Sequence, residues 1–591
     1  MVVQSKHFLN TAPSLVVDSL EGLCTLNPQL ALDAGNKVVH LASPDRSKVA
    51  IVCGGGSGHE PSHSGFVGEG ILSAAVCGTV FASPSAGQVR RAIDLVDNEK
   101  GTVIIVKNYT GDILNFGLAK EQYASTHPDR DDQVRFVIVG DDVAVGRTQG
   151  AIVGRRGLAG VCLVYKIAGA LAHRGGSLEE VYDVAQWASD HVGTIGVGLE
   201  HCHVPGTAVS DTNLGPEEIE IGLGIHNESG IRRVSPVPPL NELVPSLLEM
   251  ITSTSDKERS FLPFKGKGQD NVALLVNNLG GLSELELGCI VREVRGSLDD
   301  SNIVIKRVIS GTFMTSLNMP GFSITLLLLP DGSDPNAPSE ELILSLLDAD
   351  TSAPGWKWSS KAALSTTTQS IAPPPAPTAG RSIDLKAPDV ALFNDAIERA
   401  CKALIAAEPE ITRMDNIAGD GDCGLTLQDG ATGVLKELEK GTVTGNDVVG
   451  SVIAIARVAE ETMGGTSGAL YSIFFSALAQ GLAAGGPGAA TPQRWARALK
   501  SALERLYSYT RARPPSRTLV DPLASFVRIF NAMSTNLTSA VKIAGEAAEG
   551  TRDIVAKAGR SAYVDTALLK AERVPDPGAW GVKVVLEALA G

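Results

Sequence analysis

The stretch KVAIVCGGGSGHEP, residues 48–61, determines the fold expected for the first half of this chain. Its opening run, 48–53, is largely apolar, which is typical of a strand buried on both faces of a sheet. The glycines that follow let the backbone turn sharply and approach a ligand closely. The Gly-Lys-Ser/Thr ending of a P-loop is missing, and so is the third glycine of the dinucleotide fingerprint. The stretch therefore predicts an α/β layer that ends in a ligand site or in a tight turn.

Similar apolar runs recur along the first 350 residues, with helical patterns between them. They predict strands at 102–107, 135–140, 194–199, 272–277, 302–308 and 323–329. The last strands have short connections, which favours a mixed sheet there. We expect one α/β domain over 1–350, made of two α/β sub-domains at about 1–195 and 196–350 that meet near 190–200.

The composition changes at residue 351. The stretch 351–383 holds many Ser, Thr and Ala residues and a run of prolines, so it can bury little apolar surface. We predict a semi-extended linker there; an ordered arm wrapped on a domain is the alternative.

Helical periodicity dominates residues 384–591. Apolar side chains at 390, 393, 397, 400 and 404 share one helix face, and Pro409 is expected to end that helix. Comparable patterns predict helices at 446–463, 468–484, 493–508, 521–533 and 537–558. No convincing strand occurs, so this region predicts an all-α domain.

The net charge of the chain argues against some classes of binding partner. The 591 residues carry a formal net charge of −15, and no basic stripe compensates for it. A duplex nucleic-acid binder is therefore not expected, and no apolar run approaches the ~18 residues needed to span a bilayer. Eight scattered cysteines without a C-x-x-C pair indicate a reducing compartment. We expect a cytoplasmic protein with no nucleic-acid or membrane partner.

Two further segments of the α/β region carry candidate catalytic groups. KNYTGD, residues 107–112, follows a predicted buried strand, and ligands of open α/β sheets bind at the carboxyl ends of strands. His59 and the pair Lys107 and Asp112 could therefore face one crevice, with Asp112 as a general base; a surface ion pair is the alternative. His226 lies among the glycines of GLGIHNESG, residues 222–230, which expose its ring.

The helical region carries the clearest chemistry. DNIAGDGDCG, residues 415–424, places Asp415, Asp420 and Asp422 on a glycine-broken loop, where like charges favour an Mg²⁺ or Ca²⁺ ion. The EF-hand pattern fails because Thr426 stands where its last Glu should be. Further on, GGTSG at 464–468 opens an apolar helix, which is typical of a phosphate site. A metal and a phosphate loop in one domain predict a nucleotide, and phosphoryl transfer uses every candidate site.

These motifs together resemble a known family. GGGSGHEPSHSGFVGEGILSAAVCG (54–78), NYTGDILNF (108–116), GLGIH (222–226), DGDCG (420–424) and GGTSGALY (464–471) are similar to those of the ATP-dependent dihydroxyacetone kinases. The resemblance runs from near residue 8 to the end, in the family's order of substrate domain, linker and nucleotide domain. It implies that the helical domain is a barrel of helices, that the cofactors are ATP and Mg²⁺, and that the substrate is a small triose. We expect the active form to be a homodimer.

The resemblance also implies roles for individual residues. His226 matches the histidine that forms a covalent hemiaminal with the substrate carbonyl, Asp112 is the implied base, and His59 assists it. Residues around the bound ketone correspond to Gly56, Ser57, Gly58, His59, Lys107 and Asp112. The Mg²⁺ ligands correspond to Asp415, Asp420 and Asp422. The nucleotide contacts correspond to Cys423, Gly424, Leu425, Thr426, Thr466, Ser467, Thr510, Leu519, Arg560, Asp576, Pro577 and Gly578.

The sequence departs from the family pattern at two places. The stretch 514–522 reads PPSRTLVDP, without the Gly and Asp that usually follow the first proline, which brings loop flexibility and nucleotide affinity into question. After His226 the chain reads Asn-Glu-Ser-Gly where Gly-Glu-Pro-Gly is common. No implied catalytic residue is missing.

Three other functions stay open. The nucleotide domain could cyclise an FAD-like nucleotide as a lyase, without any ketone. A non-catalytic regulator is the second alternative, against which His226 and the three aspartates argue. A nicotinamide oxidoreductase is the third, but it requires the dinucleotide fingerprint that is missing.

Overall fold

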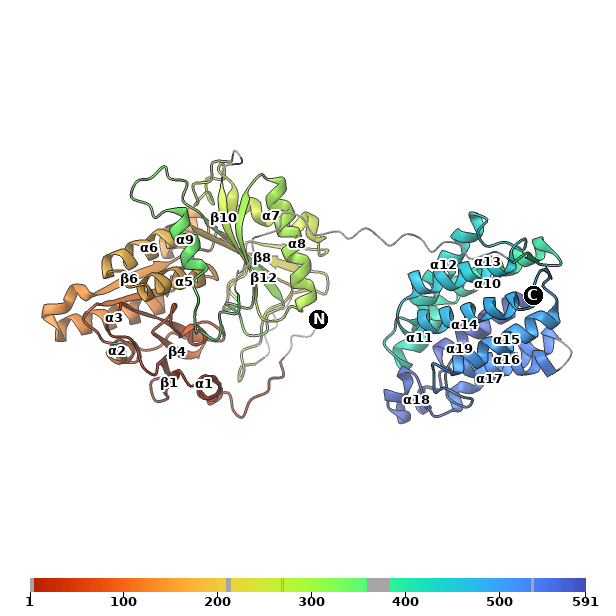
Figure 1. The fold of residues 1–591 in the computed structure, drawn as a ribbon. Coiled ribbons are helices and arrows are strands. Elements are labelled where there is room, and N and C mark those ends of the chain that lie inside the picture. Colours follow the sequence, from red (N-terminus) through yellow and green to blue (C-terminus); the bar gives the residue numbers. More distant parts are fainter. Residues whose placement is uncertain (1–4, 209–213, 267, 269, 359–382, 533–535) are drawn as a thin grey trace. The chain divides into compact units, whose positions relative to one another are not determined.

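The computed structural model describes residues 5–208, 214–266, 268, 270–358, 383–532 and 536–591. The chain divides into two compact units, 1–370 and 371–591, and Figure 1 shows the first as α/β and the second as helical. No helix among the described residues is long and apolar enough to cross a bilayer.

Two six-stranded sheets form the first unit. Sheet one contains β1 (Leu30–Asp33), β2 (Val38–Leu41), β3 (Ala50–Ser57), β4 (Ala74–Val80), β5 (Thr102–Lys107) and β6 (Val134–Val139), in the order β1-β2-β4-β3-β5-β6. Sheet two contains β7 (Val192–Gly198), β8 (Ile219–Ile221), β9 (Arg232–Val234), β10 (Asn271–Asn278), β11 (Val304–Gly311) and β12 (Gly321–Leu328), in the order β11-β10-β12-β7-β8-β9.

The two sheets differ in strand direction. In sheet one β3 pairs in parallel with both β4 and β5, and β5 pairs in parallel with β6. In sheet two only the pair β10 and β11 is parallel among the described strands, so the predicted mixed sheet is confirmed. Every strand predicted from the apolar runs is present. The sub-domain boundary predicted at residue 195 falls inside β7, which belongs entirely to sheet two.

Helices cover and connect the sheets of the first unit. They are α1 (Leu15–Leu26), α2 (Ala86–Leu95), α3 (Thr110–Thr126), α4 (Arg147–Val153), α5 (Gly160–His173), α6 (Leu178–Asp190), α7 (Leu240–Thr252), α8 (Glu284–Asp300) and α9 (Glu340–Leu347). Helix α5 packs against β3 and β5 of sheet one and against β7 and β12 of sheet two. Nearly all of its residues are buried, so it joins the two sheets into one core.

The start of the predicted linker is wrong. Ala353 and Trp356 are buried in the core of the first unit, where the Trp356 ring packs on Phe66 and Phe313 at centroid distances of 6.2 and 5.2 Å. Apolar burial of this size outweighs the cost of ordering a short segment. Most of the remaining linker prediction, 359–382, lies outside the described residues.

The second unit is helical, as predicted. It contains α10 (Val390–Ala406), α11 (Glu408–Ala418), α12 (Cys423–Glu439), α13 (Val448–Val458), α14 (Gly465–Ala483), α15 (Pro492–Tyr507), α16 (Val520–Ala532), α17 (Leu537–Gly550), α18 (Thr566–Glu572) and α19 (Pro577–Ala590). Pro409 does follow the end of α10, but it sits in the first turn of α11, where its missing N–H costs nothing. The one strand pair described here is β13 (Leu385–Lys386) with β14 (Gly488–Ala489).

Successive helices of the second unit close into a ring. Helix α10 packs on α12 and on α19, and the contacts continue from α12 through α13, α14, α15, α16 and α17 back to α19. Their inward faces form two apolar clusters, one around α14–α17 and one around α10–α12. This closed ring is the barrel of helices that the family resemblance implied.

Candidate active sites

Three segments of the first unit meet at one place: the glycine-rich turn after β3, the end of β5, and the loop between β8 and β9. The His59 Nε2 and His226 Nε2 atoms lie 3.0 Å apart. A Cβ on Gly55 would lie 3.3 Å from the Asp112 Oδ2 atom, so the carboxyl of Asp112 borders the turn. Lys107 interacts electrostatically with both His59 and Asp112. The structure thus brings together the residues predicted from separate motifs.

Aromatic rings fix the two histidines. The His59 ring stacks on Phe81 at 5.2 Å, and the same Phe81 ring meets His226 edge-on at 5.1 Å. Tyr109 also packs edge-on against the His226 ring, at 4.7 Å. Neither ring was expected at the site from the sequence. Tyr109 lies inside the KNYTGD segment but is not an acid, base or metal ligand there, and Phe81 lies outside the quoted motifs. Both imidazoles are therefore held in place before any ligand arrives.

The outer nitrogen of each histidine has an acceptor. The His59 Nδ1 atom lies 2.8 Å from the carbonyl oxygen of Thr315, and the His226 Nδ1 atom lies 2.9 Å from Glu228 Oε1. A carbonyl or carboxylate oxygen can only accept, so both Nδ1 atoms donate a proton. The two Nε2 atoms therefore face one another as the potential lone-pair atoms. Burial lowers the pKa of His59 well below its usual value, and Lys107 lowers it further.

Lys107 and Asp112 are both buried, at 0% and 3% exposure. Burial lowers the pKa of the Lys107 amine and raises that of the Asp112 carboxyl, and each group opposes the shift of the other. The Lys107 Nζ atom has no hydrogen-bond partner in the structure. Ser83 donates a hydrogen bond to Asp112. The Lys107 Nζ atom lies 5.4 Å from the centroid of the Tyr109 ring. A buried carboxylate with a raised pKa beside an amine that makes no hydrogen bond suits proton transfer from a substrate hydroxyl.

The other predicted ketone contacts are placed less directly. Gly56 is required because a Cβ there would lie 2.7 Å from the amide nitrogen of Ala82. The Ser57 hydroxyl donates to the Gly78 carbonyl at 2.9 Å, and the Gly58 amide donates to Glu60 at 2.9 Å. The donor groups of Ser57 and Gly58 are thus engaged within the protein, and their contribution is to shape the turn.

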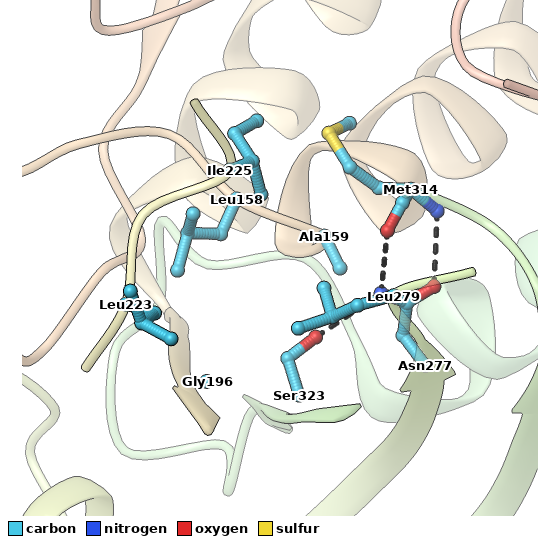
Figure 2. Close-up of a pocket in the computed structure, with 9 residues that line it drawn as sticks. All are labelled: Leu158, Ala159, Gly196, Leu223, Ile225, Asn277, Leu279, Met314 and Ser323. Atoms are coloured by element: carbon cyan, nitrogen blue, oxygen red, sulfur yellow. Dashed lines mark hydrogen bonds between the residues drawn. The ribbon is translucent and has the colours of Figure 1, made fainter. Parts of the chain in front are cut away.

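Two cavities lie near the His226 loop. Figure 2 shows the first, which has a volume of about 10 Å³ and is lined by Leu158, Ala159, Gly196, Leu223, Ile225, Asn277, Leu279, Met314 and Ser323. That volume holds about one water molecule, so no triose fits there. The second measures about 320 Å³ and borders Arg156 and Glu228. Neither of these two is lined by His59, Lys107 or Asp112.

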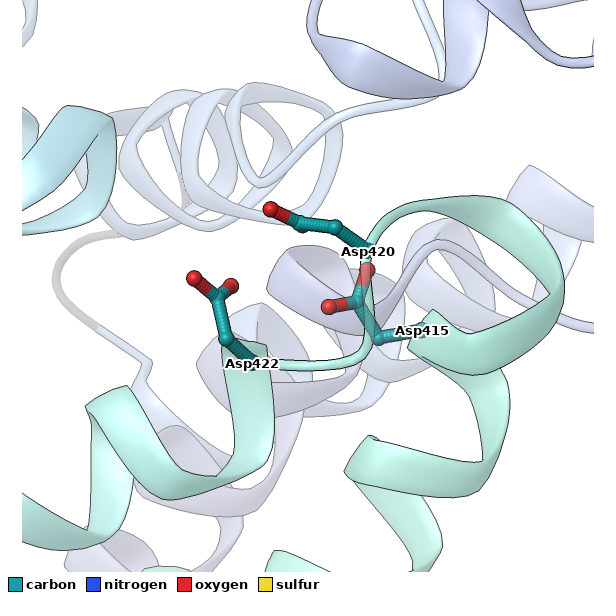
Figure 3. A group of neighbouring side chains, drawn as sticks. All are labelled: Asp415, Asp420 and Asp422. Carbon is teal, nitrogen blue, oxygen red and sulfur yellow. The ribbon is translucent and has the colours of Figure 1, made fainter. Parts of the chain in front are cut away.

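The second unit gathers the three predicted metal ligands. One carboxylate oxygen each of Asp415, Asp420 and Asp422 lies within 4.8 Å of the others. Figure 3 shows the three side chains at the turn. Asp420 and Asp422 lie in the exposed turn between α11 and α12. Asp415, predicted to lie on the same loop, instead occupies the last turn of α11 and is buried. Its Oδ2 atom accepts the amide hydrogens of Gly421 and Cys423, both at 3.0 Å, which folds the turn over it.

The electrostatics of this cluster call for a cation. Burial raises the pKa of the Asp415 carboxyl, and repulsion from Asp420 and Asp422 raises it further, against the two amide hydrogen bonds. All donors are carboxylate oxygens, which Mg²⁺ and Ca²⁺ prefer. The spacing lets one ion bridge them after small side-chain movements. The residues present therefore fit a divalent cation.

The predicted nucleotide residues surround this cluster in part. Cys423, Gly424, Leu425 and Thr426 form the first turn of α12, while Thr466 and Ser467 lie in the first turn of α14. Asp576 interacts electrostatically with Asp415 and caps α19 by accepting from Ala579 at 2.9 Å. Burial raises the pKa of Asp576 to about 6. A Cβ on Gly578 would lie 3.4 Å from Leu519 Cβ, so these two segments, distant in the sequence, touch. Pro577 precedes Gly578 as the first residue of α19.

Two predicted nucleotide residues remain apart from these contacts. Thr510 follows the end of α15, and its hydroxyl accepts the amide hydrogen of Ala512 at 3.1 Å. Arg560 begins a short 3₁₀ turn, and its side chain lies outside the described part of the chain.

The loop at 514–522, whose sequence differs from the family pattern, is held in place by several hydrogen bonds. The Asp521 carboxylate accepts from the amides of Ser516 and Thr518 at 2.9 and 2.8 Å, and also from their hydroxyls. Buried Arg517 donates to the Val574 carbonyl at 2.9 Å, which ties the loop to the segment before Asp576. Side-chain hydrogen bonds thus order this loop without the glycine usual in the family.

Comparisons with known proteins cover both units. Residues 21–355 match the Dak1 domain family, and residues 417–591 match the DAK2 domain family. The dihydroxyacetone kinase of Pichia angusta is 43% identical over 100% of this chain and 98% of its own length. The human triokinase/FMN cyclase is 38% identical over 99% of both.

A solved structure matches over the full length as well. The dihydroxyacetone kinase from C. freundii, crystallised in complex with AMP-PNP and Mg²⁺, aligns with a TM-score of 0.63 at 31% identity and covers 99% of each chain. These similarities span both candidate sites and the segment between them.

Proposed function

We infer the function of this chain from its family. The chain belongs to the dihydroxyacetone kinase family, because it contains both domains of that family in the same order. It is an ATP-dependent kinase that phosphorylates dihydroxyacetone, and we extend the proposal to glyceraldehyde. Both substrates are small trioses with a carbonyl group. The phosphoryl group passes from the nucleotide held by the second unit to a hydroxyl of the triose held by the first.

The observation that carries the proposal is the environment of the two ring nitrogens of His226. Its Nδ1 atom donates to Glu228, which leaves Nε2 as the nucleophilic nitrogen, 3.0 Å from His59. An imidazole nitrogen adds to a carbonyl carbon but not to the saturated carbon of an alcohol. We propose that the triose is held as a covalent hemiaminal on His226. Glycerol, which has nearly the same size, would then be rejected by its chemistry.

Two buried residues complete the first site. Asp112 takes the proton of the hydroxyl that accepts the phosphoryl group, and burial raises the pKa of its carboxyl, which makes it a stronger base. Lys107, with its unpartnered Nζ atom, offers a charge to the oxygens that become negative during transfer. His59 assists by holding a proton beside the carbonyl. Gly56, Ser57 and Gly58 shape the turn on which these groups depend.

The second site would hold the nucleotide. Asp415, Asp420 and Asp422 fit Mg²⁺, which when bound neutralises negative charge on the phosphate oxygens. The Cys423 amide already donates to Asp415. The next amides in the first turn of α12 and those in the first turn of α14 favour phosphate, because helix N-termini leave such groups without an intrahelical partner. Leu519 and the turn at 576–578 would contact the rest of the nucleotide, with Thr510 and Arg560 as further implied contacts.

A second activity has specific support. Relatives named triokinase/FMN cyclase match this chain over 98–99% of their own length. A cyclising lyase would use the metal and nucleotide residues of the second unit alone. The kinase is favoured because the histidine site of the first unit has no part in cyclisation. The same site, together with the three aspartates, argues against a purely regulatory protein.

An assay of ATP consumption tests the proposal. The full chain should consume ATP with dihydroxyacetone or glyceraldehyde in the presence of Mg²⁺ or Mn²⁺, and should be inactive with glycerol. Equal rates with glycerol would exclude carbonyl capture as the basis of selection. Formation of a cyclic product from FAD in the same buffer would establish the second activity.

We propose further that the enzyme works in the cytoplasm as a homodimer. The eight cysteines are all unpaired in the structure, which fits a reducing compartment. The dimer rests on the family resemblance, and sedimentation of the purified chain tests it.

A further inference from the structure

We propose that Glu228 is a positioning residue that fixes the tautomer of His226 and carries the counter-charge of the ketone adduct. The inference rests on the proposed hemiaminal and deepens it, because it assigns a role in that step to a side chain that was not among the site residues expected from the sequence. Glu228 does not touch the substrate carbon; it acts through the imidazole.

Glu228 holds His226 at two points. Its Oε2 atom accepts the backbone amide hydrogen of His226 at 2.8 Å, and its Oε1 atom lies 2.9 Å from the ring Nδ1 atom. The carboxylate therefore fixes both the main chain and the ring of the same residue. Because an ionised carboxylate only accepts hydrogen bonds, the proton must sit on Nδ1. Nε2 is then the only ring atom available to attack a carbonyl.

The charge of Glu228 is well maintained. Burial would raise the pKa of its carboxyl, but the hydrogen bonds and charge of His226 outweigh burial and lower it to about 2. The group is thus an anion throughout the range in which an enzyme works. A fixed anion beside Nδ1 favours positive charge on the imidazole ring.

The loop is built to allow this contact. A Cβ on Gly224 would overlap the Glu228 Oε2 atom, so only glycine at 224 leaves room for the carboxylate. The Gly224 amide also donates to the Glu228 carbonyl at 2.9 Å. Asn227, between the two partners, adopts a positive φ of 61° and is held by hydrogen bonds of its side chain with the amide and carbonyl of Cys202. The backbone turn that brings Glu228 onto His226 is therefore supported from both sides.

The facing histidine determines the resting protonation. His59 donates its own Nδ1 proton to Thr315, so its Nε2 atom also carries a lone pair when the ring is neutral. Two lone pairs 3.0 Å apart would repel, whereas one proton between them makes a hydrogen bond. Burial and Lys107 disfavour a second proton on His59. The extra proton that the proposal assigns to the pair therefore depends on this contact and on the negative charge of Glu228, which balances it.

With this arrangement, the atoms and charges of the capture step balance. The Nε2 atom of His226 forms a bond to the carbonyl carbon, and the π electrons of C=O move to oxygen. The proton shared with His59 passes to that oxygen and makes the hydroxyl of the hemiaminal. His226 keeps its Nδ1 proton and becomes an N-substituted imidazolium paired with Glu228. The charge before and after the step is the same, and no proton is exchanged with solvent.

Other charged and titratable groups face this pair and are part of any pH response. His59 is also influenced by Lys107 and His63, His226 interacts with Asp112, and Glu228 interacts with Tyr109 and Arg156.

Three variants of the full chain test the proposal. Glu228→Gln keeps the shape and an acceptor oxygen but removes the charge. Gly224→Ala keeps the charge but displaces the carboxylate. Ser229→Ala, at an exposed position of the same loop, is the matched control. With dihydroxyacetone labelled with ¹³C at the carbonyl and protein labelled with ¹⁵N in histidine, NMR reports the bound fraction of adduct and the state of each ring nitrogen.

We expect adduct affinity to fall about 10- to 100-fold in Glu228→Gln, the scale of a hydrogen bond to a charged group. Gly224→Ala should fall in the same direction, and Ser229→Ala should match wild type. The ¹⁵N titration of the free histidine pair should also move to lower pH in Glu228→Gln, which a purely structural role would not cause. Thermal melts test whether each variant is folded. If Gly224→Ala does not fold, the tautomer of His226 in the wild-type protein still tests the proposal.

The outcomes separate this inference from the proposed function. If wild type forms no adduct yet phosphorylates dihydroxyacetone, the hemiaminal itself fails. If wild type forms the adduct and Glu228→Gln binds it equally well, or if the adduct sits on Nδ1, the role of Glu228 is refuted while the hemiaminal stands.

Discussion

The histidine site of the first unit and the aspartate site of the second solve opposite electrostatic problems. In the first, His226, Glu228 and His59 satisfy one another within the protein, so the site is organised before a neutral triose arrives. In the second, Asp415, Asp420 and Asp422 repel one another within 4.8 Å. A site of the first kind needs nothing but substrate, whereas one of the second kind needs a cation to become useful. The contrast predicts which treatments affect one site and spare the other.

Removal of the nucleophile should have the largest effect. His226→Ala should abolish the adduct and lower kcat/KM with dihydroxyacetone by about 10³-fold or more, because no other group near the carbonyl replaces the imidazole. ATP binding in the presence of Mg²⁺ should stay as in wild type. Adduct formation is measured by NMR with labelled ketone and ATP affinity by calorimetry. An adduct that persists on a lysine, trapped by borohydride, would contradict the assignment.

Removal of the base comes next. Asp112→Asn should lower kcat by about 10²–10⁴-fold, while the adduct on His226 still forms, because the base acts on a different atom of the triose. Steady-state kinetics combined with the adduct measurement give the split. A kcat within about threefold of wild type would show that Asp112 is not the base.

The separability of the two units depends on where the chain is cut. A fragment 1–358 should fold and capture dihydroxyacetone without phosphorylating it, whereas 1–350 loses Trp356 from its core. Loss of a buried aromatic side chain typically costs about 3–5 kcal/mol, and Trp356 packs on both Phe66 and Phe313. Urea unfolding of the two fragments compares them. Equal stability would show that the segment after 350 contributes nothing to the first unit.

Loss of one metal ligand should be milder and confined to the second site. Asp422→Asn should weaken Mg²⁺-dependent ATP binding and lower kcat by at least about tenfold, since even groups behind the ligands have effects of that size. Capture of dihydroxyacetone should be unchanged in the variant and in EDTA. Calorimetry of ATP with and without Mg²⁺ provides the test. Equal ATP affinity in EDTA would refute the need for a cation.

The smallest expected effect is that of acid on the free energy of unfolding, to which the two sites should contribute with opposite signs. The pKa of Glu228 is about 2 in the folded chain against an ordinary 4.5, so its stabilising effect is complete above pH 4.5 and is lost as pH falls toward 2. About a third of its side chain is exposed, so solvent screening limits the contribution to the free energy of unfolding to about 1 kcal/mol. The pKa of Asp415 is raised, so acid relieves the strain of that cluster when metal is absent.

Unfolding free energies measured between pH 7 and pH 2.5 check this sign. Glu228→Gln should show a flatter decline than wild type over the acid range. A steeper decline in the variant would contradict the contact with His226.

The sequence predicted the sheets well because their strands are continuous apolar runs. It did not single out α5, since a helix that is buried on nearly all sides has no clear apolar face. It placed Asp415 on a loop, because the glycines after it mask the fact that α11 extends to Ala418.

The sites were predicted in unequal measure. Short motifs revealed His59, Asp112, His226 and the aspartates, because glycines and like charges cluster around them. Other contacts depend on how the loops fold in space. They are the hydrogen bond of Glu228 with His226, that of Thr315 with His59, and the contact of Leu519 with Gly578. No local pattern encodes such contacts.

One measurement tests the division of labour most directly. The full chain is mixed with ¹³C-carbonyl dihydroxyacetone in EDTA, and the carbonyl carbon is followed by NMR before and after ATP and Mg²⁺ are added. We predict that the saturated-carbon signal of the hemiaminal, coupled to the Nε2 atom of His226, reaches full intensity in EDTA. Phosphorylated product should appear only after Mg²⁺ joins ATP. An adduct that requires the metal, or product formed in EDTA, would contradict this account.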